Sequence, residues 1–505
     1  MLLNPTVKIN LCFCNLLNKK DSFYSQHAAF LYLYHSLIDS MFIQQLYTNC
    51  LAEAAYYIES NGEAAIIDPI REVEPYIALA KSRGSVIKYV LETHFHADFV
   101  SGHIDLAKQT GATIVFGPLA DTTYDVHHAV DGEEFKIGGL TLRALHTPGH
   151  TPESTCYLLL DKSFQEYCVF TGDTLFVGDV GRPDLLDGKM TKEELGSMLY
   201  DSLNKKIKTL PDEVLVYPAH GPGSSCGKNI GKETWSTIGH QKKTNYALSD
   251  IKKDEFVRAV TEGLSAPPAY FFEDARINKT GYEPIDVVYK NNNNALGSDA
   301  FQNEIKNGAQ ILDTRSCDDF EKGFIKDSIN IGLDGMFAIW VGTVLSIEKR
   351  LVIVCEKHKE EESIIRLARV GFENVAGFLN GGFETWKRAG LPSETIKTIE
   401  PKEFSEKVKA GANVLDVRNF SETEMGHISS ATVMPLAELG KNQRLLNKKE
   451  ALYVHCAGGY RSMIASSILI ANGFENVVNV HGGWSKIKDA GVDVSTGVSQ
   501  NIVAG

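Results

Sequence analysis

The chain of 505 residues is longer than one hydrophobic core usually supports, so we expect two to four domains. Its 43% apolar and 23% charged residues are typical of a soluble globular protein, and a formal net charge of -13 without a cluster of lysines and arginines argues against a nucleic-acid partner. The apolar runs fall short of the ~20 residues that span a membrane, and nine cysteines without regular spacing indicate reduced thiols in a cytoplasmic protein.

Residues 1–40 differ from the rest of the chain. They hold short apolar pieces, such as AAFLYLYHSL, without the ordered charged, apolar and cleavage regions of a signal peptide. We predict a poorly ordered extension upstream of a natural start at Met41, with a targeting role as the alternative. Over residues 41–285, brief strand-like runs such as EAAIID and TIVFG alternate with helical stretches, which predicts one larger α/β domain.

Potential metal ligands follow predicted strands at four places in this domain. The four stretches are ETHFHAD (92–98), TPGHTPES (147–154), FTGD (170–173) and YPAHG (217–221). Ligands at strand ends converge when a sheet brings those ends to one edge, so the pattern predicts a metal site. The residues leave two arrangements open. One is zinc held by His94, His96 and His150; the other is two histidines and a carboxylate with open positions, as in non-haem Fe(II) oxygenases.

The four stretches together resemble the metallo-β-lactamase superfamily over about residues 41–265, and the resemblance implies a four-layered αββα sandwich. Binuclear members of the superfamily, glyoxalase II among them, carry a further histidine where this chain has Phe99. Because a phenylalanine ring offers no lone pair, a second metal would lack a ligand, and we expect a single metal.

The longer stretch FTGDTLFVGDVGRPDL (170–185) is similar to the persulfide dioxygenase branch of the superfamily. This resemblance implies one Fe(II) per chain, held by His94, His150 and Asp173. It also places three residues behind these ligands or facing the substrate, namely His96, Asp98 and His220.

Arg182 lies in the same stretch. The resemblance implies that it binds the thiol substrate, since a fixed guanidinium suits a carboxylate or phosphate on the carrier. A structural ion pair with Asp184 is the alternative.

The carboxy-terminal part of the chain contains an internal repeat with an offset of 101 to 103 residues. NGAQILDTR (307–315) returns as AGANVLDVR (410–418), and the segment that begins GFENV at 371 returns at 473. Each copy has apolar strands that lead into helices, which predicts two α/β domains with parallel sheets, over 290–392 and 397–495. The asparagine run 291–294 and the segment 390–401 are the predicted linkers.

In the second copy, residues 456–461 (CAGGYR), which we call the thiol loop, follow a strand and lead into a helix. Glycines, a helix N-terminus and Arg461 favour a thiolate or persulfide anion on Cys456. The loop and its surroundings resemble a rhodanese domain, and this implies that Cys456 carries the transferred sulfur while Arg461 helps to hold the anion.

The first copy departs from this pattern. Its segment VCEKHKEEES (354–363) keeps Cys355 but lacks the two glycines and the arginine, and its acidic residues would repel an anion. Counted back from GFENV, Cys355 is displaced by one position. We expect a catalytically silent rhodanese-like module, with a thiol role for Cys355 or Cys317 left open.

The three-part order resembles multidomain persulfide dioxygenase/sulfurtransferase enzymes of the CstB type. It implies oxidation of a small thiol persulfide by O2 to sulfite, coupled through Cys456 to thiosulfate formation or its reverse, in sulfide detoxification by a homo-oligomer. A zinc-dependent, glyoxalase II-like thioester hydrolase and a non-catalytic persulfide sensor or sulfur-relay protein are the alternatives. The carrier thiol, coenzyme A, glutathione or another, stays open.

Overall fold

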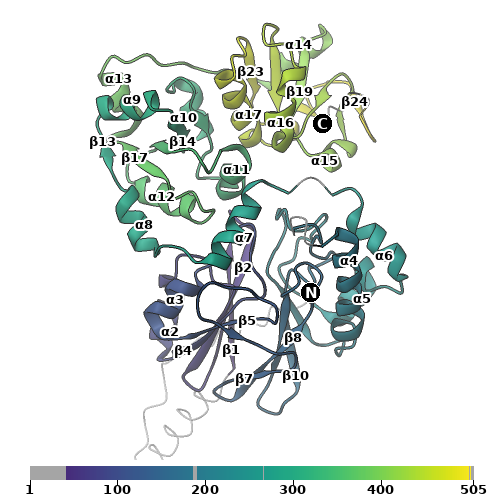
Figure 1. Ribbon diagram of the computed structural model, residues 1–505. Coiled ribbons are helices and arrows are strands. Elements are labelled where there is room, and N and C mark those ends of the chain that lie inside the picture. The colour runs from purple at the N-terminus through teal and green to yellow at the C-terminus, as the bar shows by residue number, and fades with distance from the viewer. Residues whose placement is uncertain (1–40, 186–189, 265–266, 500, 502–505) are drawn as a thin grey trace, which may run out of the picture.

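A computed structural model describes residues 41–185, 190–264, 267–499 and 501. The extension predicted over residues 1–40 lies outside the described residues. Figure 1 shows a larger N-terminal domain with two smaller domains above it. The helices α7 (Tyr270–Thr280) and α8 (Ile285–Asn292) connect the N-terminal domain to the first of the two smaller domains. None of the described helices combines the length and apolar character needed to cross a bilayer.

Two six-stranded sheets form the centre of the N-terminal domain. In spatial order, the first contains β1 (Phe42–Thr48), β2 (Glu53–Ser60), β3 (Glu63–Ile67), β4 (Val86–Leu91), β5 (Thr113–Phe116) and β6 (His127–His128). The second contains β12 (Ser236–Thr237), β11 (Leu215–Pro218), β10 (Glu166–Gly172), β9 (Thr155–Leu160), β8 (Leu140–His146) and β7 (Glu134–Ile137). The strands expected from EAAIID and TIVFG are β3 and β5.

Helices cover the outer faces of both sheets (Figure 1). Those beside the first sheet are α2 (Glu74–Arg83) and α3 (His103–Thr110); those beside the second are α4 (Lys192–Ser202), η1 (Leu203–Ile207), α5 (Ile238–Thr244), η2 (Tyr246–Leu248) and α6 (Lys253–Thr261). An apolar core that includes Tyr56, Phe135 and Phe170 joins the inner faces of the sheets. The layers are therefore αββα, as the resemblance implied.

The two repeat copies have one topology. The sheet of the first copy has the order β13 (Ala295–Leu296), β17 (Val375–Leu379), β16 (Leu351–Val354), β14 (Gln310–Asp313) and β15 (Ile329–Asn330). That of the second has β18 (Lys397–Ile399), β23 (Val477–Val480), β22 (Leu452–His455), β19 (Asn413–Asp416) and β21 (Thr432–Val433). All strand pairs within both sheets are parallel, which confirms the predicted parallel α/β domains.

The helices of the two copies also correspond. The first copy contains α9 (Ser298–Lys306), α10 (Cys317–Lys322), α11 (Phe337–Val344), α12 (Glu360–Ala368) and α13 (Gly382–Arg388). The second contains α14 (Pro401–Lys409), α15 (Phe420–Glu424), α16 (Leu436–Asn442), η3 (Gln443–Leu445), α17 (Tyr460–Ala471) and α18 (Trp484–Ile487), with a small ribbon of β20 (His427–Ile428) and β24 (Val494–Ser495).

The prediction that residues 291–294 and 390–401 are linkers is wrong in part, because both segments contribute to the folded copies. Asn292 ends α8, is buried and donates from Nδ2 to the backbone oxygen of Glu373 at 2.8 Å, while the carbonyl of Asn294 accepts from Phe378 N–H at 2.9 Å. The asparagine run therefore packs on the first copy, because amide side chains satisfy the backbone groups there. Within 390–401, Lys397–Ile399 forms the edge strand β18 of the second copy.

The first copy packs directly on the N-terminal domain. The backbone N–H of Val100, next to the predicted metal ligands, donates to the carbonyl of Arg369 at 2.7 Å. The fully buried Arg71 donates to the carbonyls of Ala368 at 2.9 Å and Glu283 at 2.7 Å. Buried polar contacts of this kind fix one orientation of the two domains.

Candidate metal centre and thiol loop

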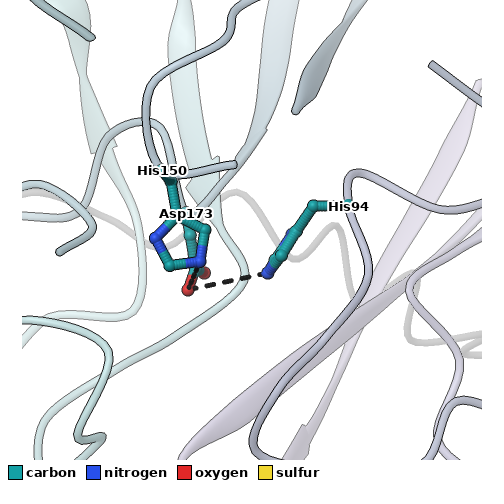
Figure 2. Close-up of side chains that lie close together, drawn as sticks. All are labelled: His94, His150 and Asp173. Atoms are coloured by element: carbon teal, nitrogen blue, oxygen red, sulfur yellow. Dashed lines mark ion pairs between the residues drawn. The ribbon is translucent and has the colours of Figure 1, made fainter. Parts of the chain in front are cut away.

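His94, His150 and Asp173 meet at one edge of the sandwich, each on a segment that follows a strand (Figure 2). His94 Nε2 lies 3.8 Å and His150 Nε2 lies 3.4 Å from Asp173 Oδ2. All three side chains are buried, and their ligand atoms lie within 4.8 Å of one another. The structure thus brings together the three residues predicted as iron ligands.

Hydrogen bonds orient both imidazoles toward this point. The Thr93 hydroxyl donates to Asp68 Oδ2 at 2.8 Å, so it accepts from His94 Nδ1 at 2.9 Å. His150 Nδ1 donates to the backbone oxygen of Arg182 at 2.8 Å. Each ring therefore carries its proton on Nδ1 and presents Nε2 as a lone-pair donor.

The donor atoms fit a divalent metal. His150 Nε2 and Asp173 Oδ2 are buried without a hydrogen-bond partner, which is costly unless a ligand engages them. Burial and the neighbouring His96 hold the pKa of His94 well below its usual range. Burial alone would raise the pKa of Asp173, but His220, His94 and His150 lower it. Neutral imidazoles and a carboxylate with open positions suit Fe(II).

Gly181 allows this close packing. A Cβ atom there would lie 2.2 Å from the backbone oxygen of Asp173 and 2.8 Å from His150 Nδ1. The glycine brings the Arg182 carbonyl to His150.

A chain of buried polar contacts runs from Asp173 through His220 to Asp98. His220 Nδ1 donates to Asp173 Oδ1 at 2.7 Å, and its Nε2 lies 2.8 Å from Asp98 Oδ2. Burial alone would lower the pKa of His220, but Asp173 and Asp98 raise it well above its usual range. Phe99 is fully buried beside His96, with ring centroids 4.3 Å apart.

His96 points to a different set of groups. Its Nε2 lies 3.1 Å from Asp68 Oδ1 and 3.5 Å from Glu92 Oε2. The His94–His150–Asp173 grouping therefore favours two histidines and a carboxylate over three histidines.

The Arg182 side chain is buried and forms a bidentate pair with Asp184, with Nε–Oδ1 2.6 Å and Nη2–Oδ2 2.8 Å. Its Nη1 also donates to the carbonyl of Ser225 at 3.3 Å. The alternative of a structural ion pair is thus present in the structure, and a role toward substrate stays a prediction.

Asn278 and Cys226 are site residues that the sequence reasoning missed. Asn278, on α7, donates to the carbonyls of His96 and Phe99 and accepts from Ser101 N–H, each at 2.8 Å. It lies about 180 positions downstream, and a lone asparagine gives no signal. Cys226 groups with Asp98 and His220; its place six residues after His220 was the available clue.

The thiol loop follows β22. Gly459 N–H donates to Cys456 Sγ at 3.2 Å, and Gly459 has a φ of 112°, a conformation that favours glycine. A Cβ on Gly483 would lie 2.5 Å from the Cys456 carbonyl, so the Gly-Gly-Trp segment supports the loop closely. Cys456 is buried, and Arg461 Nη1 and Nη2 pair with the two carboxylate oxygens of Glu422, each at 2.7 Å.

Cys355 follows β16 as Cys456 follows β22, because Val354 and His455 occupy equivalent positions opposite Asp313 and Asp416. The one-position displacement seen in the sequence thus arises after the cysteine. Burial and Glu360 raise the pKa of Cys355 to about 12. That environment opposes a thiolate.

Comparison with known proteins agrees with this geometry. The Metallo-beta-lactamase superfamily pattern matches residues 48–220, and the Rhodanese-like domain pattern matches residues 298–389 and 400–490. The chain is 33% identical over 198 residues to human "Persulfide dioxygenase ETHE1, mitochondrial", covering 39% of this chain and 70% of that protein. It is 35% identical over 176 residues to "Hydroxyacylglutathione hydrolase cytoplasmic" of Arabidopsis thaliana, covering 34% of this chain and 65% of that protein.

A crystal structure described as a metallo-beta-lactamase from Staphylococcus aureus subsp. aureus COL extends the similarity beyond the first domain. It has 31% identity and a TM-score of 0.60, and the match covers 68% of this chain and 99% of that chain. The fold and the site define a metallo-β-lactamase-fold protein fused to two rhodanese-like domains. The chain belongs to the metallo-β-lactamase superfamily, in which its first domain is related to the ETHE1 persulfide dioxygenases.

Proposed function

We propose that the chain is a non-haem iron persulfide dioxygenase that oxidises a small thiol persulfide to sulfite and is coupled to a sulfurtransferase acting through Cys456. The observation that carries this proposal is the buried His94–His150–Asp173 group, in which His150 Nε2 and Asp173 Oδ2 have no hydrogen-bond partner. The similarity to human "Persulfide dioxygenase ETHE1, mitochondrial" supports the substrate class. The expected reaction is RSSH + O2 + H2O → RSH + SO3²⁻ + 2 H⁺, in cytoplasmic sulfide detoxification.

When bound, Fe(II) supplies open coordination positions at which a persulfide and O2 can meet. The chain prepares that position in advance. Thr93 and the Arg182 carbonyl hold the two imidazoles, and His220 holds Asp173 as an anion. Because these groups are buried, they need little reorganisation when substrate arrives.

In the second copy, Cys456 accepts the outer sulfur of a donor. The Sγ–S bond forms as the bond between that sulfur and the carrier breaks, and the departing thiolate or sulfite keeps the electron pair. Gly459 N–H stabilises the charge on Sγ. Transfer from Cys456 persulfide to sulfite gives thiosulfate, and the reverse uses the same groups. We propose that the first copy has a packing role, with Cys355 silent.

A zinc-dependent thioester hydrolase is the second candidate, because the first domain is also similar to a hydroxyacylglutathione hydrolase. Phe99 argues against a two-metal site of that kind.

Metal analysis and two assays test the proposal. We expect about one iron per chain and O2 uptake with glutathione persulfide or coenzyme A persulfide. Asp173→Ala should lose both, whereas Cys456→Ser should keep O2 uptake and lose thiosulfate formation. Two zinc ions with thioester cleavage would establish the rival, and wild-type O2 uptake by Asp173→Ala would refute the metal assignment.

A further inference from the structure

Glu422 holds the arginine of the thiol loop. It lies on α15 and accepts two parallel hydrogen bonds from the Arg461 guanidinium, each of 2.7 Å. The pair is only partly exposed, 17% for the Arg461 side chain and 29% for that of Glu422. Such bidentate pairs fix direction as well as charge. Burial alone would raise the pKa of Glu422, but the bonds and charge of Arg461 lower it, so the carboxylate is ionised.

The position of Glu422 is itself fixed by its helix. Its carboxylate also accepts from the backbone N–H of Asn419, and the two residues form a capping box at the start of α15. Arg461 therefore meets a carboxylate that the backbone has already placed.

The first copy provides an internal comparison. Both copies keep a buried aspartate–arginine pair at the end of their second strand: Asp313 of β14 with Arg315, and Asp416 of β19 with Arg418. The aspartate–arginine pair therefore belongs to the common fold. At the third residue of the following helix, however, the first copy has Asp319, which pairs with Lys322 on its own helix at 3.2 Å. The pair of Glu422 with Arg461, which we call the clamp, therefore occurs in the copy that keeps the thiol loop.

The clamp has an electrostatic consequence. Arg461 is the only cationic residue in the thiol loop, and pairing with Glu422 makes the net charge of the two side chains zero. Neutralisation of Arg461 weakens its Coulomb attraction for an anionic sulfur donor, and the loss is about twice as large for a donor with two negative charges as for a donor with one. Thiosulfate is a dianion, whereas the reacting end of a thiol persulfide is a monoanion. The clamp therefore disfavours thiosulfate more strongly.

We propose that Glu422 is a positioning residue for sulfur transfer, which directs Arg461 and biases Cys456 toward thiol persulfides over thiosulfate as sulfur donors. This inference rests on the sulfurtransferase half of the proposed function. With either donor, Sγ of the Cys456 thiolate attacks the outer sulfur and forms a persulfide. The leaving group is a thiolate in one case and sulfite in the other, and no external oxidant or reductant is needed.

The test compares two donors with one acceptor. Donor KM and kcat are measured for thiosulfate and for glutathione persulfide, with cyanide as acceptor, in the wild-type chain and in Glu422→Gln. Glutamine preserves the capping box, so the helix should remain intact. If removal of the charge lowers the persulfide KM about threefold, doubling the Coulomb energy lowers the thiosulfate KM about ninefold, and donor preference moves about threefold toward thiosulfate.

Two further variants separate charge from structure. Glu424→Gln removes the same charge from an exposed position on the same helix and should leave both KM values unchanged. Glu422→Asp keeps the charge and should keep the wild-type donor preference. The inference is overturned if Glu422→Gln leaves the donor preference unchanged, or if Glu422→Asp shifts it as far. Sulfur transfer that persists in Cys456→Ser would instead refute the proposed function.

Discussion

The Tyr460 hydroxyl donates to the backbone carbonyl of Gly332 across 2.7 Å, and this contact joins the thiol loop to the first rhodanese-like copy. A Cβ on Gly335 would lie 2.5 Å from the Tyr460 ring, so the ring packs against the same segment. The next residue, Met336, lies near Gly223, which follows His220 by three positions. A Cβ added to Gly223 would be 3.5 Å from the Met336 side chain. One loop of the first rhodanese-like copy thus lies against both the thiol loop and the segment that follows His220.

Removing the Tyr460 hydroxyl tests this junction. Tyr460→Phe leaves the Gly332 carbonyl without its partner, so we expect the free energy of unfolding to fall by about 1 kcal/mol. Because the tyrosine lies within the thiol loop, sulfur transfer should slow severalfold while O2 uptake persists. Denaturant unfolding and both assays measure this. The partly exposed Tyr453 of β22 gives the matched Tyr→Phe control, and an equal loss of O2 uptake in Tyr460→Phe would contradict the prediction.

Gly181→Ala should abolish iron binding without unfolding the chain. The added Cβ would lie 2.2 Å from the backbone oxygen of Asp173 and 2.8 Å from His150 Nδ1, both shorter than real Cβ contacts. Asp173 and His150 would therefore have to move apart. Iron content after reconstitution and the melting temperature are the measurements. Gly139→Ala is the control, because the nearest atom to its Cβ is 3.4 Å away. Full iron occupancy in Gly181→Ala would show that Asp173 and His150 are not both ligands.

Asn278→Ala should loosen the segment that carries His96 and Phe99. Three buried hydrogen bonds are lost, which predicts a decrease of about 2–4 kcal/mol in the free energy of unfolding. Iron affinity should also fall, because His94 lies on the same segment. Asn303→Ala on the exposed face of α9 is the control for a loss of amide. Unchanged iron affinity and stability would refute a role for α7 in supporting the metal site.

Cys355 and Cys317 should resist alkylation near neutral pH. Burial raises the pKa of both to about 12, assisted by Glu360 at Cys355 and by Asp334 at Cys317. Both thiols are therefore protonated below that pH, and the thiolate fraction at pH 8 is about 1 in 10,000. In a Cys456→Ser background, iodoacetamide labelling measured by mass spectrometry should rise about tenfold per pH unit from pH 8 to 10. Rapid labelling at pH 7 would reopen a thiol role for these cysteines.

The repeat and its apolar strands predicted the two parallel copies, and ligands at strand ends predicted a metal site at one edge of a sheet. The αββα layers and the choice of His94, His150 and Asp173 came instead from the resemblance to the metallo-β-lactamase superfamily. Contacts between segments that are distant in the chain could not be predicted from the sequence. No local pattern joins Asn278 to Phe99, or Glu422 to Arg461, since the members of these pairs lie 179 and 39 positions apart in the chain. The asparagine run was misassigned because amide side chains serve packed helix ends as well as open linkers.

The backbone hydrogen bond between Val100 and Arg369 connects the first rhodanese-like copy to the N-terminal domain beside His94. The turn around Arg369 thus supports the segment that follows the predicted metal ligand His94. A fragment cut after the first domain would expose Arg71 and release Val100. We therefore expect the first domain and the first copy to unfold in one transition, and substitutions at Arg369 to weaken metal binding at His94.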